Sequence, residues 1–572
     1  MINSVTREPI ARALVYCPDN RFATLTNSEG RFEFTVAKTA ADPDSDSNPS
    51  NSQNYRPAID RPFALLARKP GYMSDPSHPS QNLQNEPVQD VTLTLVPESL
   101  IVGTVTLPTS EAPDSITLQV FRRQVQDGRA HWVLAGGTQS KSDGQFRFAE
   151  LPAGTYKLLT QELLDRDPLT SDPRVDPFAS DAGGPSFGYP PIYYQSAPDF
   201  GSASAIPVAA GQTAQANLTL VKQPYYRVRI PVVAPAATDP NGAPLNGLNV
   251  NVYPHGRKGP GFSLAYNYLH HAIEGLLPDG TYIIEASSMG PNGLTGWQTI
   301  TIRGAPIDGL KVGGTTLTLL PNASIPVNVK EEFTAIDHSG AVSWNINGRN
   351  TTMKGPRRYL NVTLESVDDF GVAQSGSLRN PSRGDDPLVI DAVPPGRYWV
   401  RINSSRGYPA SVHSGNLDLL HQPLVVAAGG GSAPIEITMR DDSAEISGTV
   451  EGVTPPARTP ISGNFGVATA ASYPTAVDRG THIYCIPLPD SPGQFTEIWV
   501  NTDGSFVSQG IAPGAYRLLA FDRPQSDLEY RNPEAMRAYD SKGPVIRLVG
   551  GQKERVTLQL ISTSISSNEP SN

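Results

Sequence analysis

The sequence predicts an all-β protein, built as a tandem array of antiparallel β-sandwich domains. The main observation is a repeated motif, Pro-x-Gly-x-Tyr. It occurs at Pro152–Tyr156, Pro278–Tyr282 and Pro394–Tyr398, with a variant at Ala512–Tyr516. The motif glycines 154, 280, 396 and 514 are 126, 116 and 118 residues apart. This spacing is too long for a solenoid repeat and suits one β-sandwich per copy.

A second motif, Asp/Glu-Gly-x-Phe, marks a hairpin turn in several of the repeats. It occurs at Glu29–Phe32, Asp143–Phe146 and Asp503–Phe506. The acidic residue and the glycine favour a tight turn, and the phenylalanine begins the next inward-facing strand. Because the phenylalanine lies ten residues before the motif tyrosine in two distant repeats, both repeats are expected to fold alike.

The first motif has a direct structural interpretation. Proline fixes φ at the start of a turn, and we expect the glycine to take a positive φ at the next corner. The tyrosine then enters a strand. Its side chain packs between the sheets and its hydroxyl reaches the backbone, as in a tyrosine corner.

A third element closes each repeat. It is a glycine-containing turn followed by a strictly alternating strand, as in Ala210–Leu220, Gly429–Met439 and Gly550–Leu560, and the strand of the first repeat is Val91–Leu95. Alternation with a period of two indicates a half-buried strand.

These motifs divide the chain into five units and a tail. The predicted bounds are 1–97, 98–221, 222–320, 321–440, 441–562 and, for a mobile tail, 563–572. Unit one is expected to lack its first strand and to carry a disordered insert over 40–54. Units three and four are more diverged. A short surface helix is predicted over Asn532–Ala538, since asparagine caps it and proline takes its first position.

The composition excludes several classes of protein. Gly (51) and Pro (54) are abundant, as expected for many short strands joined by turns. The net charge is −10, and no basic cluster long enough to follow a phosphate backbone occurs, so nucleic acid is not an expected partner. Two cysteines, Cys17 and Cys485, exclude a disulfide scaffold. Each follows an apolar-Tyr pair, so both are interpreted as core thiols at one equivalent position.

No run of eighteen apolar residues occurs, so no membrane span is predicted. The first ten residues lack the apolar core of a signal peptide. They resemble the middle of a repeat, from which we expect that the natural N-terminus is incomplete here.

The combination of Gly103-Thr-Val105 or Gly448-Thr-Val450 with the two motifs resembles the carboxypeptidase regulatory-like domain family. Units two and five match best, and the others match in part. The resemblance implies prealbumin-like, Ig-like or carbohydrate-binding-like sandwiches, arrayed as in large bacterial secreted or cell-surface proteins. It therefore implies an extracytoplasmic location more than an activity, because the regulatory domain of metallocarboxypeptidases is itself non-catalytic.

No catalytic, cofactor-binding or metal-binding residues are predicted. Gly184–Gly188 matches a nucleophile elbow but lies in a Pro/Gly-rich loop without the required strand and helix. Residues 42, 44 and 46 are aspartates at calcium-loop spacing, yet the glycine and glutamate of such a loop are missing. Arg383–Asp385 is an integrin-type tripeptide and is interpreted as a turn. The histidines show no zinc spacing.

Aromatic loops are the one positive indication of binding. Two segments, Phe187–Tyr194 and Phe262–Tyr268, place several aromatic side chains outside the expected sheets. Exposed tyrosines beside amides suit sugars or peptides, since a flat apolar face and polar edges are offered together. The alternative is that these side chains cover the end of a sandwich or a joint between units. The candidate ligand-binding residues are Tyr189, Tyr193, Tyr194, Tyr266 and Tyr268.

The predicted function is that of a non-catalytic, secreted or cell-surface binding or adhesion scaffold. Two alternatives remain open: an array of carbohydrate-binding modules, and an accessory region of a larger secreted peptidase or outer-membrane transporter. The partners expected under these hypotheses are a polysaccharide or a cell-surface protein, and no cofactor is expected.

Overall fold

The computed structural model confirms an all-β fold. It describes the chain except for residues 19–21, 35–62, 76–80, 84–90, 109–114, 165–185, 236–246, 255–257, 289–292, 335–341, 347–348, 354, 371–373, 381–385, 454–479 and 563–572. The predicted insert 40–54, the tail 563–572, the aspartates of the calcium pattern, the start of the Gly-x-Ser-x-Gly match and the 383–385 tripeptide lie outside the described residues. Regular structure in the rest is almost entirely strand.

The five largest hydrophobic cores of the described residues follow one another along the chain, and two smaller clusters lie beside them. The buried residues of the five largest cores span 1–95, 101–220, 228–319, 323–439 and 444–558. We propose that each core belongs to one of the five predicted units, and the names unit one to unit five are kept on that basis.

Unit one has two small sheets, in the strand orders β3-β2-β4-β6 and β1-β7-β5. The strands are β1 (Ile2–Asn3), β2 (Leu14–Tyr16), β3 (Ala23–Leu25), β4 (Phe63–Arg68), β5 (Tyr72–Ser74), β6 (Gln81–Leu83) and β7 (Thr94–Pro97). Strand β1 has only two residues.

Unit two contains the longest hairpin of the described chain, β9–β10. Its sheets run β10-β9-β12-β15 and β11-β8-β16, with β17 also on β8. The strands are β8 (Ser99–Thr106), β9 (Thr117–Gln126), β10 (Arg129–Gln139), β11 (Gln145–Leu151), β12 (Gly154–Thr160), β13 (Leu163–Leu164), β14 (Ser186–Tyr189), β15 (Ile206–Val208), β16 (Thr213–Gln215) and β17 (Leu218–Thr219).

Unit three shares a sheet with unit two, because β13 and β14 extend its seven-stranded sheet in the order β13-β14-β18-β21-β20, with β24 and β25 also on β18. Its second sheet runs β19-β22-β23-β26. The strands are β18 (Gln223–Val233), β19 (Asn249–Pro254), β20 (Ala265–Asn267), β21 (Ala272–Pro278), β22 (Gly280–Ser287), β23 (Leu294–Ile302), β24 (Ile307–Asp308), β25 (Leu317–Thr318) and β26 (Leu320–Pro321).

Unit four packs the sheet β32-β27-β37-β34-β35 on the sheet β31-β30-β33-β36, beside a separate hairpin β28–β29. Its elements are β27 (Ala323–Glu332), β28 (Val342–Ile346), β29 (Arg349–Met353), η1 (Gly355–Arg358), β30 (Leu360–Ser366), β31 (Gln374–Ser377), β32 (Val389–Val393), β33 (Gly396–Ser404), β34 (Tyr408–Ser414), β35 (Leu417–Asp418), β36 (Leu424–Val426) and β37 (Ile435–Arg440).

Unit five is one continuous sheet, β40-β39-β42-β44-β38-β41, with β43 on β42. Its elements are β38 (Ala444–Glu451), β39 (His482–Pro487), β40 (Thr496–Trp499), β41 (Ser505–Ile511), β42 (Gly514–Phe521), α1 (Pro533–Met536), η2 (Arg537–Tyr539), β43 (Val545–Leu548) and β44 (Lys553–Ile561). The predicted helix is confirmed, since the Asn532 side chain accepts hydrogen bonds from the backbone of Glu534 and Ala535 at the start of α1.

The first strand of every unit lies beside, and parallel to, one or two strands near the end of that unit. The pairs are β1 with β7, β8 with β16 and β17, β18 with β24 and β25, β27 with β37, and β38 with β44. The remaining ladders are antiparallel apart from the contact of β42 with β44. The units that carry the repeated motifs therefore share one pattern of strand pairing.

The four motif tyrosines occupy the same place, as predicted. All four are buried, and each hydroxyl donates to the carbonyl four residues earlier: Tyr156 to Pro152, Tyr282 to Pro278 at 3.2 Å, Tyr398 to Pro394 at 2.8 Å, and Tyr516 to Ala512 at 2.5 Å. Burial raises the pKa of each of these hydroxyls.

The prediction that the motif glycine takes a positive φ holds for two of the four copies, and only near the extended limit. Gly154 and Gly280 have φ of 159°, which is close to extended, and Gly396 and Gly514 are not at positive φ. The glycine is needed for space instead, because a Cβ at Gly280 would lie 2.9 Å from the hydroxyl of Tyr282. The hairpin glycines do fit the prediction, since Gly30, Gly144 and Gly504 have φ of 71°, 78° and 83°.

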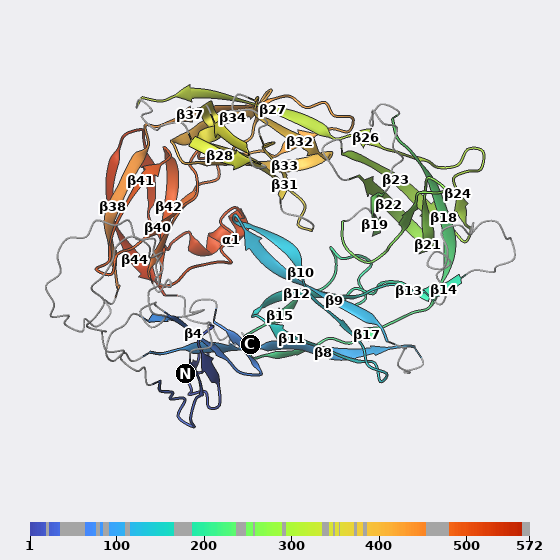
Figure 1. The fold of residues 1–572 in the computed structure, drawn as a ribbon, viewed down its shortest axis with the longest axis horizontal. Coiled ribbons are helices and arrows are strands. Elements are labelled where there is room, and N and C mark those ends of the chain that lie inside the picture. Colours follow the sequence, from blue (N-terminus) through green and yellow to red (C-terminus); the bar gives the residue numbers. More distant parts are fainter. Residues whose placement is uncertain are drawn as a thin grey trace, which may run out of the picture.

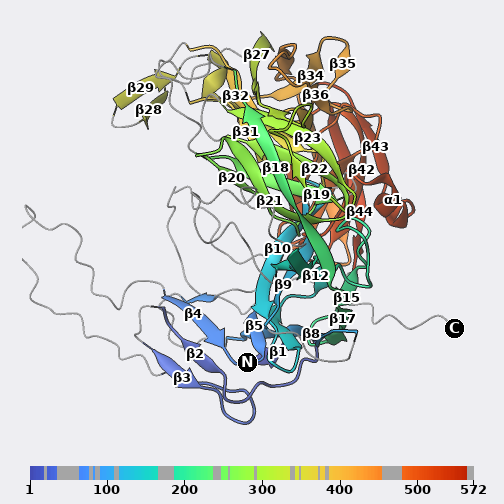
Figure 2. The ribbon, with the colours of Figure 1, turned by 90° about the vertical axis from the view of Figure 1, so that its right-hand side faces the viewer.

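Units two to five follow one another around a closed four-unit ring, and hairpin β9–β10 points toward its centre (Figure 1). Figure 2 shows unit one beside β8, at the opposite end of the molecule from β34–β36 of unit four. Cys17 and Cys485 are both buried and form no disulfide, as expected for core thiols.

Candidate functional site

Tyr193, one of the predicted ligand-binding residues, lies in the joint between units two and three. Its side chain is buried, and its hydroxyl donates to the carbonyl oxygen of Pro260 at 2.7 Å. Burial raises the pKa of this hydroxyl. Gly261 packs against the same hydroxyl, because a Cβ at that glycine would lie 2.4 Å from it. The aromatic side chain therefore serves the joint and does not face solvent.

The other four predicted tyrosines do not gather around one surface. Tyr189, on β14, and Tyr194 are half-buried against the core of unit two, and Tyr266, on β20, is half-buried against the core of unit three. Only Tyr268 among the five is exposed, at 54%. The two aromatic segments thus mostly form inter-unit strands and cover the sandwich ends.

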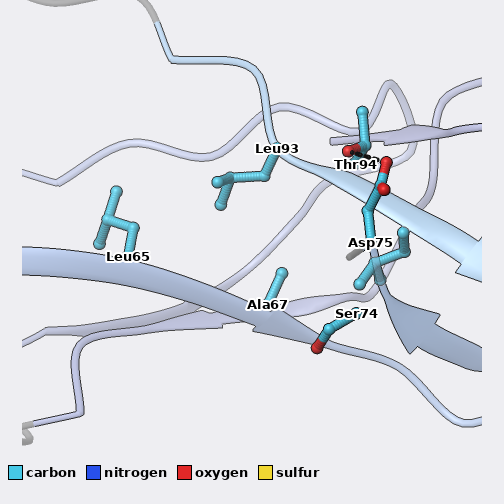
Figure 3. Close-up of a pocket in the computed structure, with 7 residues that line it drawn as sticks. Leu65, Ala67, Ser74, Asp75, Leu93 and Thr94 are labelled. Atoms are coloured by element: carbon cyan, nitrogen blue, oxygen red, sulfur yellow. Dashed lines mark hydrogen bonds between the residues drawn. The ribbon is translucent and has the colours of Figure 1, made fainter. Parts of the chain in front are cut away.

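A hollow in unit one is also small, and two of the polar side chains that line it are hydrogen-bonded to each other. It lies between β4, β5 and β7, and is lined by Leu65, Ala67, Ser74, Asp75 and Leu93–Leu95. Figure 3 shows the Thr94 hydroxyl pointing to Asp75, to which it donates at 2.8 Å. Among the described residues, no group of three His, Cys, Asp or Glu side chains is arranged to hold a metal ion, and no described helix is long and apolar enough to cross a bilayer.

The most elaborate constellation in the described chain is at the tip of hairpin β9–β10, at the centre of the four-unit ring. The tip is Asp127–Gly128, with φ of 49° and 72°. Left-handed φ at both positions is that of a type I′ hairpin turn, for which Asp-Gly is well suited. We name the contacts of this hairpin with units four and five the hairpin joint.

Unit five holds one side of the tip. Arg123 donates through both terminal nitrogens to the Glu529 carboxylate, with the Nη2–Oε2 pair at 2.9 Å. The Tyr530 hydroxyl donates to Asp127, and Arg531 lies 3.0 Å from the same carboxylate. The hydrogen bond from Arg123 holds the pKa of Glu529 below its ordinary value, and burial raises the pKa of Tyr530.

Gly128 is needed where the tip meets unit five. The Tyr530 side chain lies directly over it, because a Cβ at Gly128 would approach three ring atoms to 2.8 Å. The backbone N–H of Arg531 also donates to the carbonyl oxygen of Gly128 at 3.2 Å. Any side chain here would push the two units apart.

Unit four holds the other side of the hairpin. The Arg129 guanidinium stacks 4.0 Å from the centre of the Trp399 side chain, and Arg401 lies 3.0 Å from Asp127. The buried His131 imidazole and Glu365 carboxylate lie 3.1 Å apart. Burial lowers the pKa of Arg129 to about 10.

A backbone contact and an aromatic cluster complete this side. Trp132 on β10 pairs with Phe370 in a parallel bridge, and its N–H donates to Asp369 at 2.7 Å. The cluster joins units two and four, and it consists of Phe121, Trp132, Phe200 and Phe370, with ring centres 5.1 to 5.9 Å apart. Beneath it the Lys157 ammonium lies 4.8 Å from the Trp132 ring and donates to the carbonyls of Phe200 and Gly201.

Neighbouring units are joined as well. Lys258 of unit three lies 2.9 Å from Asp368 of unit four. The Gln494 side chain of unit five donates to Pro409 of unit four at 3.2 Å. Together with the hairpin joint, these contacts close the four-unit ring and fix its geometry. Their chemistry is that of an interface, with charges paired across units.

Sequence reasoning missed the hairpin joint because its partners are separated by up to 406 positions along the chain. One signal was present. Strands β9 and β10, with 10 and 11 residues, are long for a sandwich, and their tip is rich in arginine and aromatic residues. Such residues at the end of an overlong hairpin are typical of an interface.

Comparisons with known proteins leave the family open. No family model matches the chain, and no curated protein matches it. Solved structures with some similarity include the Bacillus anthracis TIE protein (10% identity, 78% of this chain and 68% of that one, TM-score 0.14). Others are two B repeats of the collagen-binding protein of Staphylococcus aureus (9%, 75% and 94%, 0.14) and the RrgB pilus protein of Streptococcus pneumoniae (7%, 82% and 99%, 0.13). TM-scores this low indicate neither a shared arrangement of domains nor a shared function.

Proposed function

We propose that this chain is a non-catalytic, extracytoplasmic binding or adhesion scaffold whose units two to five are held in one fixed arrangement. The observation that carries the proposal is the hairpin joint, in which one hairpin binds two units that are not its neighbours in the chain. Sandwich domains present loops at their ends on a rigid frame, and a closed ring fixes several such ends relative to one another. A surface of this kind suits a large partner, namely a polysaccharide or a cell-surface protein.

The charges of the hairpin joint are paired across units in a specific arrangement. Domains within a chain move relative to each other by default unless their interface is extensive. Opening this interface would separate Glu365 of unit four from His131 of unit two. It would also separate Asp127 of unit two from Arg401 of unit four and Arg531 of unit five. Deleting one partner while the ring stays closed would leave the other charge buried and unpaired, which is strongly unfavourable, so these pairs favour one specific geometry of the closed ring.

The extracytoplasmic location rests on the motif resemblance to carboxypeptidase regulatory-like domains. Fractionation of the source cells, with an antibody against the purified chain, tests it. The protein is expected in the secreted, periplasmic or surface fraction, and a purely cytosolic protein would contradict the proposal.

Binding by the purified chain tests the function itself. We expect saturable binding to intact source cells or to their surface polysaccharide, measured with labelled chain. The double variant Arg123→Ala/Arg401→Ala removes one contact on each side of the hairpin joint, and binding is expected to weaken at least about tenfold if the partner spans two units. Absence of binding to every surface fraction, or turnover of a surface polymer, would count against a non-catalytic scaffold.

Carbohydrate binding is a second candidate function, favoured by two exposed tryptophans. Trp499, at the end of β40, is 60% exposed, and Trp297, on β23, is 50% exposed. Each has a carboxylate close by: Glu497 two residues before Trp499 and Glu285 directly across the ladder from Trp297. An indole face beside a carboxylate offers stacking together with hydrogen-bond acceptors for sugar hydroxyls.

A glycan array with single variants tests this second candidate. Trp297→Ala and Trp499→Ala change exposed side chains, so each is expected to fold normally and to lose binding of any glycan that the wild type retains. Tyr268→Ala tests the exposed residue among the predicted tyrosines in the same way. An array that stays blank for the wild type would exclude the carbohydrate-binding function. The further alternative, an accessory region of a larger peptidase or transporter, stays a prediction.

A further inference from the structure

The hairpin joint holds one arginine against a tryptophan and beside a carboxylate. Glu365 on β30 and Trp399 on β33 lie directly opposite each other, so their side chains share one face of the sheet. The Arg129 guanidinium of unit two lies 4.0 Å from the centre of the Trp399 side chain. Burial lowers the pKa of this guanidinium, and the nearby Glu365 charge acts in the opposite direction. The His131 imidazole lies 3.1 Å from the same carboxylate. A tryptophan, a glutamate and a histidine therefore surround a cation that the chain itself supplies.

Unit five carries the same three residue types on the outer face of its sheet. Ile498 on β40 lies in the core, so its neighbours Glu497 and Trp499 point away from that core. Nδ1 of the buried His482 lies 2.8 Å from Oε1 of Glu497, and the imidazole ring centre lies 4.9 Å from that of Trp499. Strand β40 is an edge strand of its sheet. We name Glu497 and Trp499 the edge pair.

Within the part of the chain that the structure describes, no lysine or arginine occupies the edge pair. The ring contact of Trp499 and the ion pair of Glu497 are both with His482. Trp499 is 60% exposed, and the Glu497 side chain is 38% exposed. A carboxylate can accept about four hydrogen bonds, so Glu497 can take a further donor. The hydrogen bond from His482 also holds the pKa of Glu497 below its ordinary value, which keeps the carboxylate charged at neutral pH.

The second exposed tryptophan differs from the edge pair in this respect. Trp297 lies directly opposite Glu285 across the ladder, but Lys258 Nζ lies 3.9 Å from the Glu285 carboxylate. That carboxylate therefore already has a cation of the chain beside it. Of these two exposed tryptophans, Trp499 is the one whose neighbouring carboxylate has no lysine or arginine partner among the described residues.

We propose that the edge pair binds an arginine side chain of a partner polypeptide, as Trp399 and Glu365 hold Arg129. A guanidinium can stack flat on the indole and donate hydrogen bonds from its edge to the carboxylate. The position of Arg129 in the hairpin joint makes arginine the expected cation, and the exposed negative charge of Glu497 complements it. This inference rests on the proposed function, and it specifies the partner as a protein with an exposed arginine.

Two matched peptides test the edge pair. The probe is acetyl-Gly-Ser-Arg-Ser-Gly amide, and its control has citrulline, which keeps the shape of arginine without the charge. The full chain is prepared with isotope-labelled tryptophan, and the indole N–H resonance of Trp499 is identified by its loss in Trp499→Phe. We expect the arginine peptide to shift this resonance saturably at millimolar concentrations. The citrulline peptide should bind at least about fivefold more weakly, because it offers neither a cation to the indole nor an ionic hydrogen bond to the carboxylate.

Two glutamine variants separate the edge pair from general attraction of a cation to an acidic protein. Glu497→Gln keeps the shape of the side chain and removes its charge, so the arginine peptide should bind about fivefold more weakly. Glu285→Gln makes the same change beside Trp297 and should leave binding at Trp499 unchanged. Equal binding of the two peptides, equal effects of the two variants, or a Trp499 resonance that does not move would overturn the proposal.

The same measurements distinguish this site from the proposed function and from other ligands. If labelled chain binds source cells but the peptide leaves the Trp499 resonance unmoved, this inference fails and the proposed scaffold stands. If the peptide binds but the chain binds no surface fraction, the proposed function fails instead. A glycan that needs Trp499 for binding, without any response to the arginine peptide, would assign the edge pair to carbohydrate and overturn the proposal. If the chain dimerises and the peptide dissociates the dimer, the donor is a second copy and the assigned partner is wrong.

Discussion

At the scale of single residues, the buried tyrosine hydroxyls hold each sandwich at the same point. Every one of the four donates to a carbonyl four residues back along its own turn, so it ties the strand to the turn that precedes it. Tyr516 makes a second hydrogen bond, because its oxygen also accepts from the backbone of Gln494 at 3.1 Å. The four tyrosines therefore occupy the same position in their units, but Tyr516 is held by more hydrogen bonds than the others.

Replacing a corner tyrosine with phenylalanine should measure this difference. Tyr398→Phe leaves one buried carbonyl without its donor and should lower the stability of unit four by about 1 kcal/mol. Tyr516→Phe leaves both a carbonyl and an amide unpaired and should lower that of unit five by about 2 kcal/mol. Amide exchange resolved by unit provides the measurement. Tyr268→Phe, at an exposed position, is the control, and equal losses in units four and five would contradict the argument.

The position of the motif tyrosine could be predicted from the sequence because the turn, the tyrosine and the carbonyl that accepts its hydrogen bond all lie within five residues of each other. The turn, the buried ring and the hydroxyl contact all follow from Pro-x-Gly-x-Tyr. The backbone conformation of the glycine could not be predicted from the motif. The motif shows that a glycine is needed, but not whether the reason is a positive φ or a lack of space for a side chain. Gly280 shows that space is the reason, through the Tyr282 hydroxyl beside it.

At the scale of elements, hairpin β9–β10 does more than complete the sheet of unit two. One strand face supplies the aromatic cluster with Phe370, and the tip supplies the charges that meet units four and five. The same element type occurs in unit four as β28–β29, yet only the β9–β10 tip is seen between other units in the described chain (Figure 1). The role of hairpin β9–β10 as a joint therefore comes from the units that surround its tip, not from the hairpin alone.

The Arg123–Glu529 pair should make closure of the ring sensitive to acid. The hydrogen bond from Arg123 holds the pKa of Glu529 below its ordinary value in the closed form. A carboxyl group with a lowered pKa stabilises the closed form above its ordinary pKa, and this contribution is lost as the pH falls through the lowered value. Small-angle scattering should therefore show expansion beginning below about pH 4.

Glu529→Gln is the control for this dependence. Its amide cannot ionise, so the variant should start from a weaker joint at pH 7 and lose less between pH 5 and pH 3. A wild type whose radius of gyration stays constant down to pH 3 would show that the pair does not govern closure.

Periodicity predicted the strands of this hairpin but not its partners. Alternation sets which side chains face the core of unit two, whereas the contacts with Glu365 and Glu529 depend on the curvature of the whole array. The candidate aromatic loops failed for a related reason: a tyrosine that leaves its own sheet has the same local sequence whether it meets solvent or, like Tyr193, the next unit.

At the scale of the whole molecule, four sandwiches close on themselves and unit one stands apart (Figures 1 and 2). Short connections between consecutive units limit the angle at each joint, and the hairpin joint sets the last of these angles. A chain of the same units without that hairpin would be an open string. Closure of the ring thus depends on hairpin β9–β10, which contacts units four and five.

A single methyl group at the hairpin tip should open the ring. Gly128→Ala adds a Cβ that would lie 2.8 Å from the Tyr530 side chain, at a backbone φ of 72°. We expect a larger radius of gyration in small-angle scattering and exposure of the Trp399 side chain to quenchers.

Gly71→Ala is a matched control for this experiment. It adds the same methyl group at a φ of 83°, with no atom within 4 Å of the new Cβ. Any cost of the left-handed backbone is therefore shared by the two variants, and only Gly128→Ala should change the dimensions of the molecule. Expansion of both variants, or of neither, would contradict the role assigned to the tip.

The parallel pairing of first and last strands has a mechanical consequence. When a unit is pulled by its two ends, the first strand is drawn one way and its parallel neighbour the other. In units two to five the hydrogen bonds between them are then loaded together, in shear, and do not open one after another. We expect each of these units to resist tension well beyond what its stability at rest would suggest.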